Sequence, residues 1–156
     1  MLLILIGLVF FNEGLILMKN LATKDLFKNY YHLEPSMAQK LAVLTAAPSL
    51  LKILTGFIID AKLFAQRKHI LMISGTVQFV CYFLLTFIRF DSAYAVTALL
   101  ACATLSLVFQ DTTMESYIVQ QARYDPINGQ QDLQAYRLIF FGVGLGVGGT
   151  VSAFAD

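Results

Sequence analysis

Four short polar segments divide the chain into five long apolar runs. The polar segments lie near residues 31–35, 60–68, 89–92 and 124–131. Each run can supply the roughly 20 residues that a transmembrane helix needs. Because backbone polar groups in hydrocarbon must be satisfied within a helix or a closed barrel, the pattern predicts an all-α fold. We expect a polytopic membrane bundle of about five transmembrane helices, forming one membrane domain over residues 1–156.

The first two helices have recognisable ends. The first run extends from Leu2 to about Met18 and continues as a helical pattern to Tyr30, where lysines place its far end in water. After Pro35, the segment Ser36-Met37-Ala38-Gln39 has the spacing of a capping box, in which the Ser and Gln side chains satisfy amides at a helix start. We therefore expect the second helix to begin there and to end near Asp60.

The remaining three runs are bounded by turn residues. The third spans His69 to Ile88, and Ser92 is the expected N-cap of a fourth helix from Ala93. The fourth run turns polar after Phe109, so its last turns either leave the membrane or face a wet interior. Pro, Asn and Gly residues mark a loop over residues 124–131, and the fifth helix is expected to start near Asp132.

Composition supports a membrane protein and excludes several functions. Hydrophobic residues make up 58% of the chain and charged residues 13%, and the mean hydropathy is +0.69, well beyond the usual globular balance. The net charge is +1, and the basic residues are scattered among loops, so no nucleic-acid partner is expected. The first run has neither a basic leading segment nor a clear cleavage site, and we interpret it as a true span and not a signal peptide.

No residue pattern indicates catalysis, a metal site or a cofactor. Cys81 and Cys102 lie inside apolar runs, where a thiol behaves as a small hydrophobe. His32 and His69 lie in or beside loops without a second ligand at metal spacing. We find no nucleophile–base arrangement, phosphate-cradling loop or redox motif, so no enzyme activity and no cofactor are predicted.

Glycines are concentrated in the fifth run, which carries Gly142, Gly144, Gly146, Gly148 and Gly149. Glycines four residues apart let a second helix backbone approach closely, a common device in membranes. We expect Gly142, Gly146 and Gly149 to serve helix packing, and the alternative is a contact with substrate.

The loop between the second and third runs carries a family resemblance. Gly56, Asp60, Arg67 and Lys68 resemble the Gly-x-x-x-Asp…Arg-Arg signature that major facilitator superfamily carriers place on the cytoplasmic side between their second and third helices. The resemblance implies that these residues act in gating or topology by latching neighbouring helices. The positive-inside rule leans weakly to the same side, because lysines and arginines flank both membrane faces.

Further motifs, in order along the chain, resemble the folate-biopterin transporter family. The segments Lys24-Asp25-Leu26 and Leu33-Glu34-Pro35-Ser36 are similar to the stretch after that family's first helix. The family's second, fourth and fifth helices carry motifs similar, in that order, to Pro48…Lys52…Gly56…Asp60, Asp111…Glu115…Val119…Arg123 and Leu133-Gln134…Arg137…Gly142…Gly146. The resemblance implies about five of twelve helices, an amino-terminal part of a carrier whose substrate site lies between two pseudo-symmetric halves.

Charges inside the apolar runs are the candidate site residues, because an ionised group in hydrocarbon is costly and rarely idle. Lys52 lies eight residues before Asp60, roughly 12 Å from the membrane edge at 1.5 Å per residue. It would either neutralise an anionic substrate such as a pterin-glutamate or pair with an acid on a neighbouring helix.

The acidic candidates are Asp111, Glu115 and Glu13. Asp111 and Glu115 are four residues apart on one helix face, where they could share a proton or partner Lys52 and Arg137. The alternative is a solvated helix end. Arg137 suits recognition of a carboxylate or anchoring at the interface. Glu13, in the middle of the first run, must be protonated or paired if that run spans the membrane.

Two functions follow from these residues and the resemblance. The first is a partial carrier for folate, pterin or another organic anion, which proton coupling could drive. The second is a non-transporting, carrier-derived accessory subunit of a larger membrane complex. Expected partners are the lipid bilayer and other transmembrane helices, and the membrane is either the plasma membrane or that of an organelle such as a mitochondrion or plastid.

Overall fold

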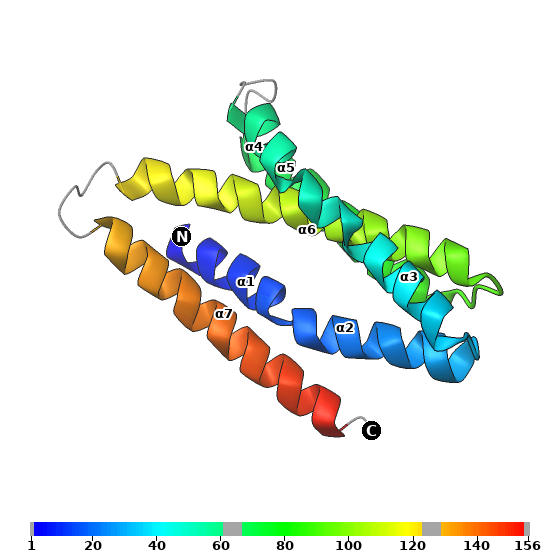
Figure 1. Ribbon diagram of the computed structural model, residues 1–156. Coiled ribbons are helices and arrows are strands. Elements are labelled where there is room, and N and C mark those ends of the chain that lie inside the picture. The colour runs from blue at the N-terminus through cyan, green and yellow to red at the C-terminus, as the bar shows by residue number, and fades with distance from the viewer. Residues whose placement is uncertain (1, 61–66, 123–128, 155–156) are drawn as a thin grey trace. The chain divides into compact units, whose positions relative to one another are not determined.

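The computed structural model describes residues 2–60, 67–122 and 129–154, and nearly all of these are helical. The elements, drawn in Figure 1, are α1 (Leu2–Gly14), α2 (Ile16–Asp25), the π-helix η1 (Leu26–Tyr30), α3 (Pro35–Ala46), the 3₁₀-helix η2 (Ala47–Leu51), α4 (Lys52–Asp60), α5 (Arg67–Phe87), α6 (Ala93–Ala122) and α7 (Gly129–Phe154).

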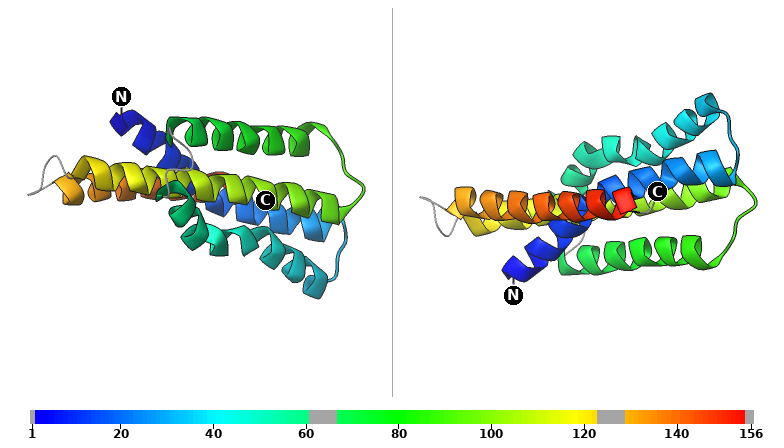
Figure 2. Two further views of the ribbon diagram at one scale, coloured as in Figure 1. Left: turned by 90° about the horizontal axis from the view of Figure 1, so that it is seen from above. Right: turned by 90° about the horizontal axis from the view of Figure 1, so that it is seen from below.

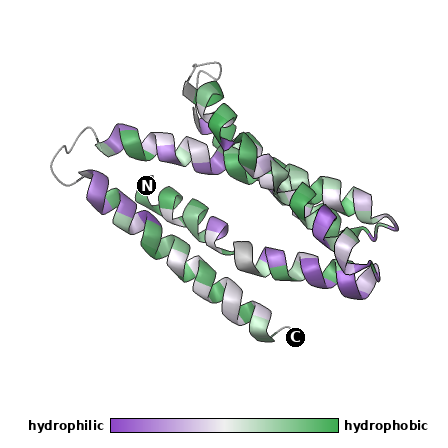
Figure 3. Cartoon of the chain, in the orientation of Figure 1, coloured by the Kyte–Doolittle hydropathy of each residue, from purple (hydrophilic) through white to green (hydrophobic). Residues whose placement is uncertain are grey.

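Within these residues, five helical segments are long and apolar enough to cross a membrane. They are Leu3–Tyr30, Pro35–Ile59, Lys68–Phe87, Ala93–Ala122 and Gly129–Phe154. Hydrophobic residues predominate along most of their length (Figure 3), and many large apolar side chains are exposed, among them Leu50, Ile53 and Phe79. Such surfaces suit contact with lipid. The prediction of an all-α membrane fold with five spans is confirmed.

The chain divides into two compact units, which we describe separately. One comprises Met1–Ala22 with Met114–Asp156, and the other comprises Thr23–Thr113. The boundaries fall inside α2 and α6. Assignment of residues 1–156 to one membrane domain stays a prediction.

The first span has a local interruption. α1 ends at Gly14 and α2 begins at Ile16, although the amide of Leu15 still donates to the carbonyl oxygen of Phe11 at 3.2 Å. Because glycine weakens a helix interior, the break falls where the sequence permits it most easily. The single long helix expected over this run is therefore two helices and a terminal π-turn.

The turn after η1 is fixed by two features. His32 adopts a left-handed backbone conformation with φ 48°, which histidine tolerates better than most residues. The Tyr31 hydroxyl donates to the carbonyl oxygen of Phe90. Burial, with smaller effects from Tyr30 and Asp91, raises the pKa of the Tyr31 phenol, which favours the protonated donor form.

The second span starts and continues differently from the sequence prediction. Glu34 is the N-cap and makes no side-chain cap bond, while Pro35 occupies the first turn. The predicted capping box at Ser36 and Gln39 is therefore wrong, because proline, whose fixed φ suits the first helical position, starts the helix one residue earlier. Pro48 lies in η2 and lacks an amide hydrogen, so the span tightens to 3₁₀ geometry before Lys52.

The other predicted boundaries agree within a few residues. α5 begins two residues before His69, and α6 begins at Ala93, as expected from Ser92. The Ser92 carbonyl oxygen accepts bonds from the amides of Ala95 and Val96. α7 begins at Gly129, three residues before the expected start.

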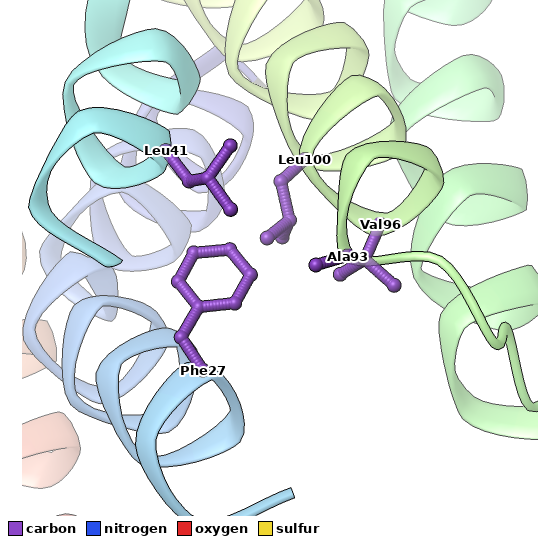
Figure 4. Close-up of a cluster of buried hydrophobic side chains, with 5 residues drawn as sticks. All are labelled: Phe27, Leu41, Ala93, Val96 and Leu100. Carbon is purple, nitrogen blue, oxygen red and sulfur yellow. The ribbon is translucent and has the colours of Figure 1, made fainter. Parts of the chain in front are cut away.

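A buried apolar cluster connects three segments of the Thr23–Thr113 unit. Phe27 of η1, Leu41 of α3 and Leu100 of α6 pack together with Ala93 and Val96 (Figure 4). Phe27 has no exposed surface. The cluster fixes the starts of the second and fourth spans beside each other, and these two helices therefore run in parallel.

The other unit depends on a close contact between α1 and α7. A Cβ atom added to Gly144 would clash with the carbonyl oxygen of Phe11 and lie 3.0 Å from the Cα of Gly14. One added to Gly14 would lie 2.8 Å from the Cα of Gly144. Only glycine permits these backbones to meet, and a Cβ at Gly148 would reach the Cα of Leu15 at 3.4 Å.

The three glycines that the sequence analysis assigned to helix packing lie on the other side of α7. Added Cβ atoms at Gly142, Gly146 and Gly149 would meet nothing within 4 Å. Sequence spacing alone does not tell which glycine set faces α1, because both sets have the four-residue repeat. The role of Gly142, Gly146 and Gly149 in packing against another helix stays a prediction.

Gly144→Ala and Gly146→Ala should have opposite effects on stability. Alanine is favoured over glycine in a helix by about 1 kcal/mol, so Gly146→Ala, which meets open space, should be neutral or stabilising. Gly144→Ala forces α1 from α7 and should destabilise the fold by about 1–3 kcal/mol. Unfolding in mixed detergent micelles measures both, and equal stability of the two variants would contradict the contact.

Candidate functional site

An ion pair inside the Thr23–Thr113 unit joins the second and fourth spans. The Lys52 Nζ atom of α4 lies 2.5 Å from the Asp111 Oδ2 atom of α6. The Asp111 side chain is 8% exposed and the Lys52 side chain is 41% exposed. The carboxylate is thus enclosed by the protein, whereas the lysine remains partly accessible.

The two charges lie at the same depth in their spans. Lys52 follows the start of α3 by 17 residues, and Asp111 follows the start of α6 by 18. Both also lie well inside their spans, since Lys52 is seven residues before Ile59 and Asp111 is eleven residues before Ala122, roughly 10 Å and 16 Å at 1.5 Å per residue. Such a position is costly for a single charge, so the pairing explains how both are tolerated.

Two hydroxyl groups connect the same helices beside the ion pair. Thr55 Oγ1 of α4 and Thr112 Oγ1 of α6 are 3.1 Å apart, and both residues are buried. Gly56 follows Thr55 inside α4, where an added Cβ would make an ordinary 3.9 Å contact with Thr112. Gly56 therefore lies on the face that approaches α6, although sterics alone do not demand glycine there.

A neutral amide pair connects α6 to α5. Gln110 Nε2 donates to Gln78 Oε1 at 2.7 Å, and the residues are 6% and 7% exposed. α5 and the α3–α4 segment lie on opposite sides of α6 (Figure 2). One turn of α6, residues 110, 111 and 112, is therefore bonded to helices on both of its sides.

A second ion pair lies in the unit that contains α1 and α7. Arg137 Nη1 of α7 lies 2.8 Å from Glu115 Oε1 of α6. The Arg137 Cζ atom also lies 4.4 Å from the centre of the fully buried Phe10 ring of α1. The guanidinium is therefore oriented by a carboxylate and by an aromatic face.

The sequence offered two arrangements for the acidic residues, and the structure contains one of them. Asp111 is paired with Lys52 and Glu115 with Arg137. The roles of these four residues in binding substrate or protons stay predictions. Glu13 lies in the last turn of α1, which ends at Gly14, and its Oε2 atom is enclosed by protein. A role for Glu13 in proton coupling also stays a prediction.

A comparison with known protein families identifies the family of this chain. The BT1 family matches residues 13–155, which include all five spans in whole or in part. The chain belongs to the BT1 family. This confirms the resemblance to folate-biopterin transporters, which are integral membrane proteins. No curated protein and no solved structure matches the chain.

Parts of the predicted gating loop lie outside the described structure of this BT1-family chain. Asp60 ends α4 and Arg67 begins α5, but residues 61–66 and the side chains of Asp60 and Arg67 are outside the described residues. Lys68 is exposed near the start of α5. The latch role of this loop stays a prediction.

Some of the polar contacts in this BT1-family chain could be anticipated from its sequence, and others could not. Gln78 is a polar residue in the middle of an apolar run, which is a signal for a buried hydrogen bond. Thr55 and Thr112 gave no signal, because threonine is common in membrane helices and usually bonds its own backbone. Among the described residues, no group of three or more His, Cys, Asp or Glu residues lies close enough to hold a metal ion.

Removing one member of the Lys52–Asp111 pair should destabilise the chain more than removing both. The remaining charge would lose its partner in a poorly solvated place. We expect Lys52→Met or Asp111→Leu to cost about 1–3 kcal/mol, less than for a fully enclosed pair because Lys52 is partly exposed. The double variant should regain much of that loss. A double-mutant cycle from unfolding measurements checks this, and additive losses would contradict the pairing.

Proposed function

We propose that this BT1-family chain contributes the anion-binding part of a carrier for folate, pterin or a related organic anion. The observation that carries the proposal is the Lys52–Asp111 pair, which places an ammonium group at intramembrane depth with 41% of the lysine side chain exposed. Ionisable residues inside membrane spans mark substrate or proton pathways in transporters. An anionic substrate offers a carboxylate that competes with Asp111 for the lysine.

Proton coupling is the second part of the proposal. Asp111 and Glu115 each accept a bond from a basic side chain. A carboxylate that takes up a proton releases its cation to a substrate anion, so that no net charge is added to the apolar layer. Arg137 is the second candidate for a substrate carboxylate, since its guanidinium can form two parallel bonds.

Lys52→Ala and Asp111→Asn should each abolish uptake of a folate or pterin without preventing insertion. Both changes remove a charge required by the binding step, and uptake into vesicles that contain the chain measures the effect. Lys40→Ala is the matched control, because Lys40 is an exposed lysine on α3 of the same span. Normal uptake by both site variants would show that these residues do not carry substrate.

An accessory role in a larger membrane complex is the second candidate. The observation that favours it is the open side of α7, where Gly142 and Gly146 offer a four-residue glycine repeat with no neighbour within 4 Å. A helix of another subunit could approach this side closely. In that case the ion pairs hold the chain together and bind no substrate.

Gly142→Leu and Gly146→Leu should release the chain from such a complex with little effect on its own fold. Leucine would keep a partner backbone at a distance, and particle size after gentle detergent extraction measures the association. Val151→Leu, an exposed change on the same helix, is the control.

The native particle distinguishes the two functions directly. A 17.3 kDa chain held in a large assembly that loses it on these changes supports the accessory role. Retention of both variants in the assembly, or a polypeptide much heavier than 17.3 kDa that runs alone, would contradict it.

A further inference from the structure

Three consecutive residues of α6 make polar contacts with two different helices. Gln110 bonds to Gln78 of α5 at 2.7 Å, and Asp111 bonds to Lys52 of α4 at 2.5 Å. Thr112 contacts Thr55 of α4 at 3.1 Å. Because α5 and α4 lie on opposite sides of α6 (Figure 2), this turn is held from both directions.

Directional contacts matter more here than they would in water. Lipid is as apolar as leucine, so burial of apolar surface does little to fix the rotation of a membrane helix about its axis. Successive residues of an α-helix are 100° apart, since a turn has 3.6 residues. A rotation of α6 by one residue position would therefore turn Asp111 away from Lys52, and the bonds of Gln110 and Thr112 oppose that rotation.

We propose that Gln110 and Thr112, with their partners Gln78 and Thr55, are positioning residues for the anion site. They fix the rotation of α6 so that the Asp111 carboxylate meets the Lys52 ammonium. This inference rests on the proposed carrier function, in which Lys52 binds the substrate anion. They act on the site through Lys52 and Asp111.

The threonine contact has a defined hydrogen balance. Thr55 Oγ1 lies 2.8 Å from the carbonyl oxygen of Lys52, and Thr112 Oγ1 lies 2.8 Å from that of Val108. The two hydroxyl groups have two hydrogens for three contacts, one to each carbonyl oxygen and one between the hydroxyls. The threonine that donates to the other hydroxyl no longer donates to the carbonyl oxygen on its own helix, and the other threonine accepts the bond. Serine preserves this exchange, whereas valine, which has nearly the same shape, abolishes it.

The amide pair is better explained by positioning than by stability alone. Interhelical hydrogen bonds in membranes average only about 0.6 kcal/mol, because the separated helices also find partners. Both glutamines are more than nine-tenths buried, and an apolar pair would fill the same space without enclosing two amides. The bond adds direction, which an apolar contact does not supply.

The test compares substrate kinetics of Gln110→Leu and Thr112→Val, singly and together, in reconstituted vesicles. A misplaced Asp111 should raise the KM for the organic anion about ten- to hundredfold, as expected for displacements near 1 Å, with a smaller change in kcat. Thr112→Ser should retain the wild-type KM. Gln120→Leu is the matched control, because Gln120 is an exposed glutamine of the same helix.

A second measurement does not depend on transport. The infrared absorption of the Asp111 carboxylate, isolated by subtraction of the Asp111→Asn spectrum, reports its contact with the ammonium. We expect the band to shift in the double variant and in Thr112→Val, which is nearly isosteric and should fold. It should not shift in Gln120→Leu or Thr112→Ser.

The outcomes separate the two proposals. A shifted band together with a raised KM supports both. A band that shifts in the variants, together with a wild-type chain that shows no uptake, supports positioning and contradicts the carrier function. An unshifted band, or a loss of kcat at constant KM, overturns the positioning role whether or not the chain transports.

Discussion

The pairing of charge inside the apolar layer is the constraint on which the spans of this chain depend. An unpaired carboxylate or ammonium near the middle of a bilayer costs at least about 2.5–3.5 kcal/mol. α6 carries two acids four residues apart, and each is matched by a basic residue on another span, Lys52 and Arg137. The same acids that would destabilise α6 as a single helix therefore connect it to its neighbours, and their spacing determines which helices it can bind.

The contact between α1 and α7 and the polar contacts of α6 in the Thr23–Thr113 unit hold helices together by different physical means. α1 and α7 meet through backbone contact at Gly14 and Gly144, where dispersion forces act over short distances. In the Thr23–Thr113 unit, polar side chains connect α6 to α4 and to α5. Close packing tolerates little change of side-chain volume, whereas hydrogen-bonded contacts tolerate volume changes but require donor and acceptor chemistry. Substitutions at these two kinds of contact should therefore fail for different reasons.

The sequence predicted the helices well and their contacts only in part. Five apolar runs and their turn residues determined the spans, and the acid pair on α6 limited the possible partners of Lys52 and Arg137. The glycine set that meets α1 was not predictable, because Gly142 with Gly146 and Gly144 with Gly148 have the same spacing. The phase of a helix depends on tertiary contacts that one sequence does not reveal. The helix start at Pro35 with Glu34 as N-cap, and the 3₁₀ turn at Pro48, were missed because proline overrode the local helix signals.

The unequal exposure of Lys52 and Asp111 bears on the choice between a carrier and an accessory subunit. The attraction within an ion pair is strongest when water is excluded from both groups, although enclosing them also costs desolvation energy. In this chain the acid is 8% exposed and the lysine 41% exposed. That asymmetry leaves the cation open to a second anion while the carboxylate stays in place, which is the arrangement that exchange of partners requires. Under the proposed carrier function, the turn of α6 that carries Asp111 would need to be held from both sides, because a carboxylate that recovers its lysine after each exchange has to keep its orientation while the lysine is bound elsewhere.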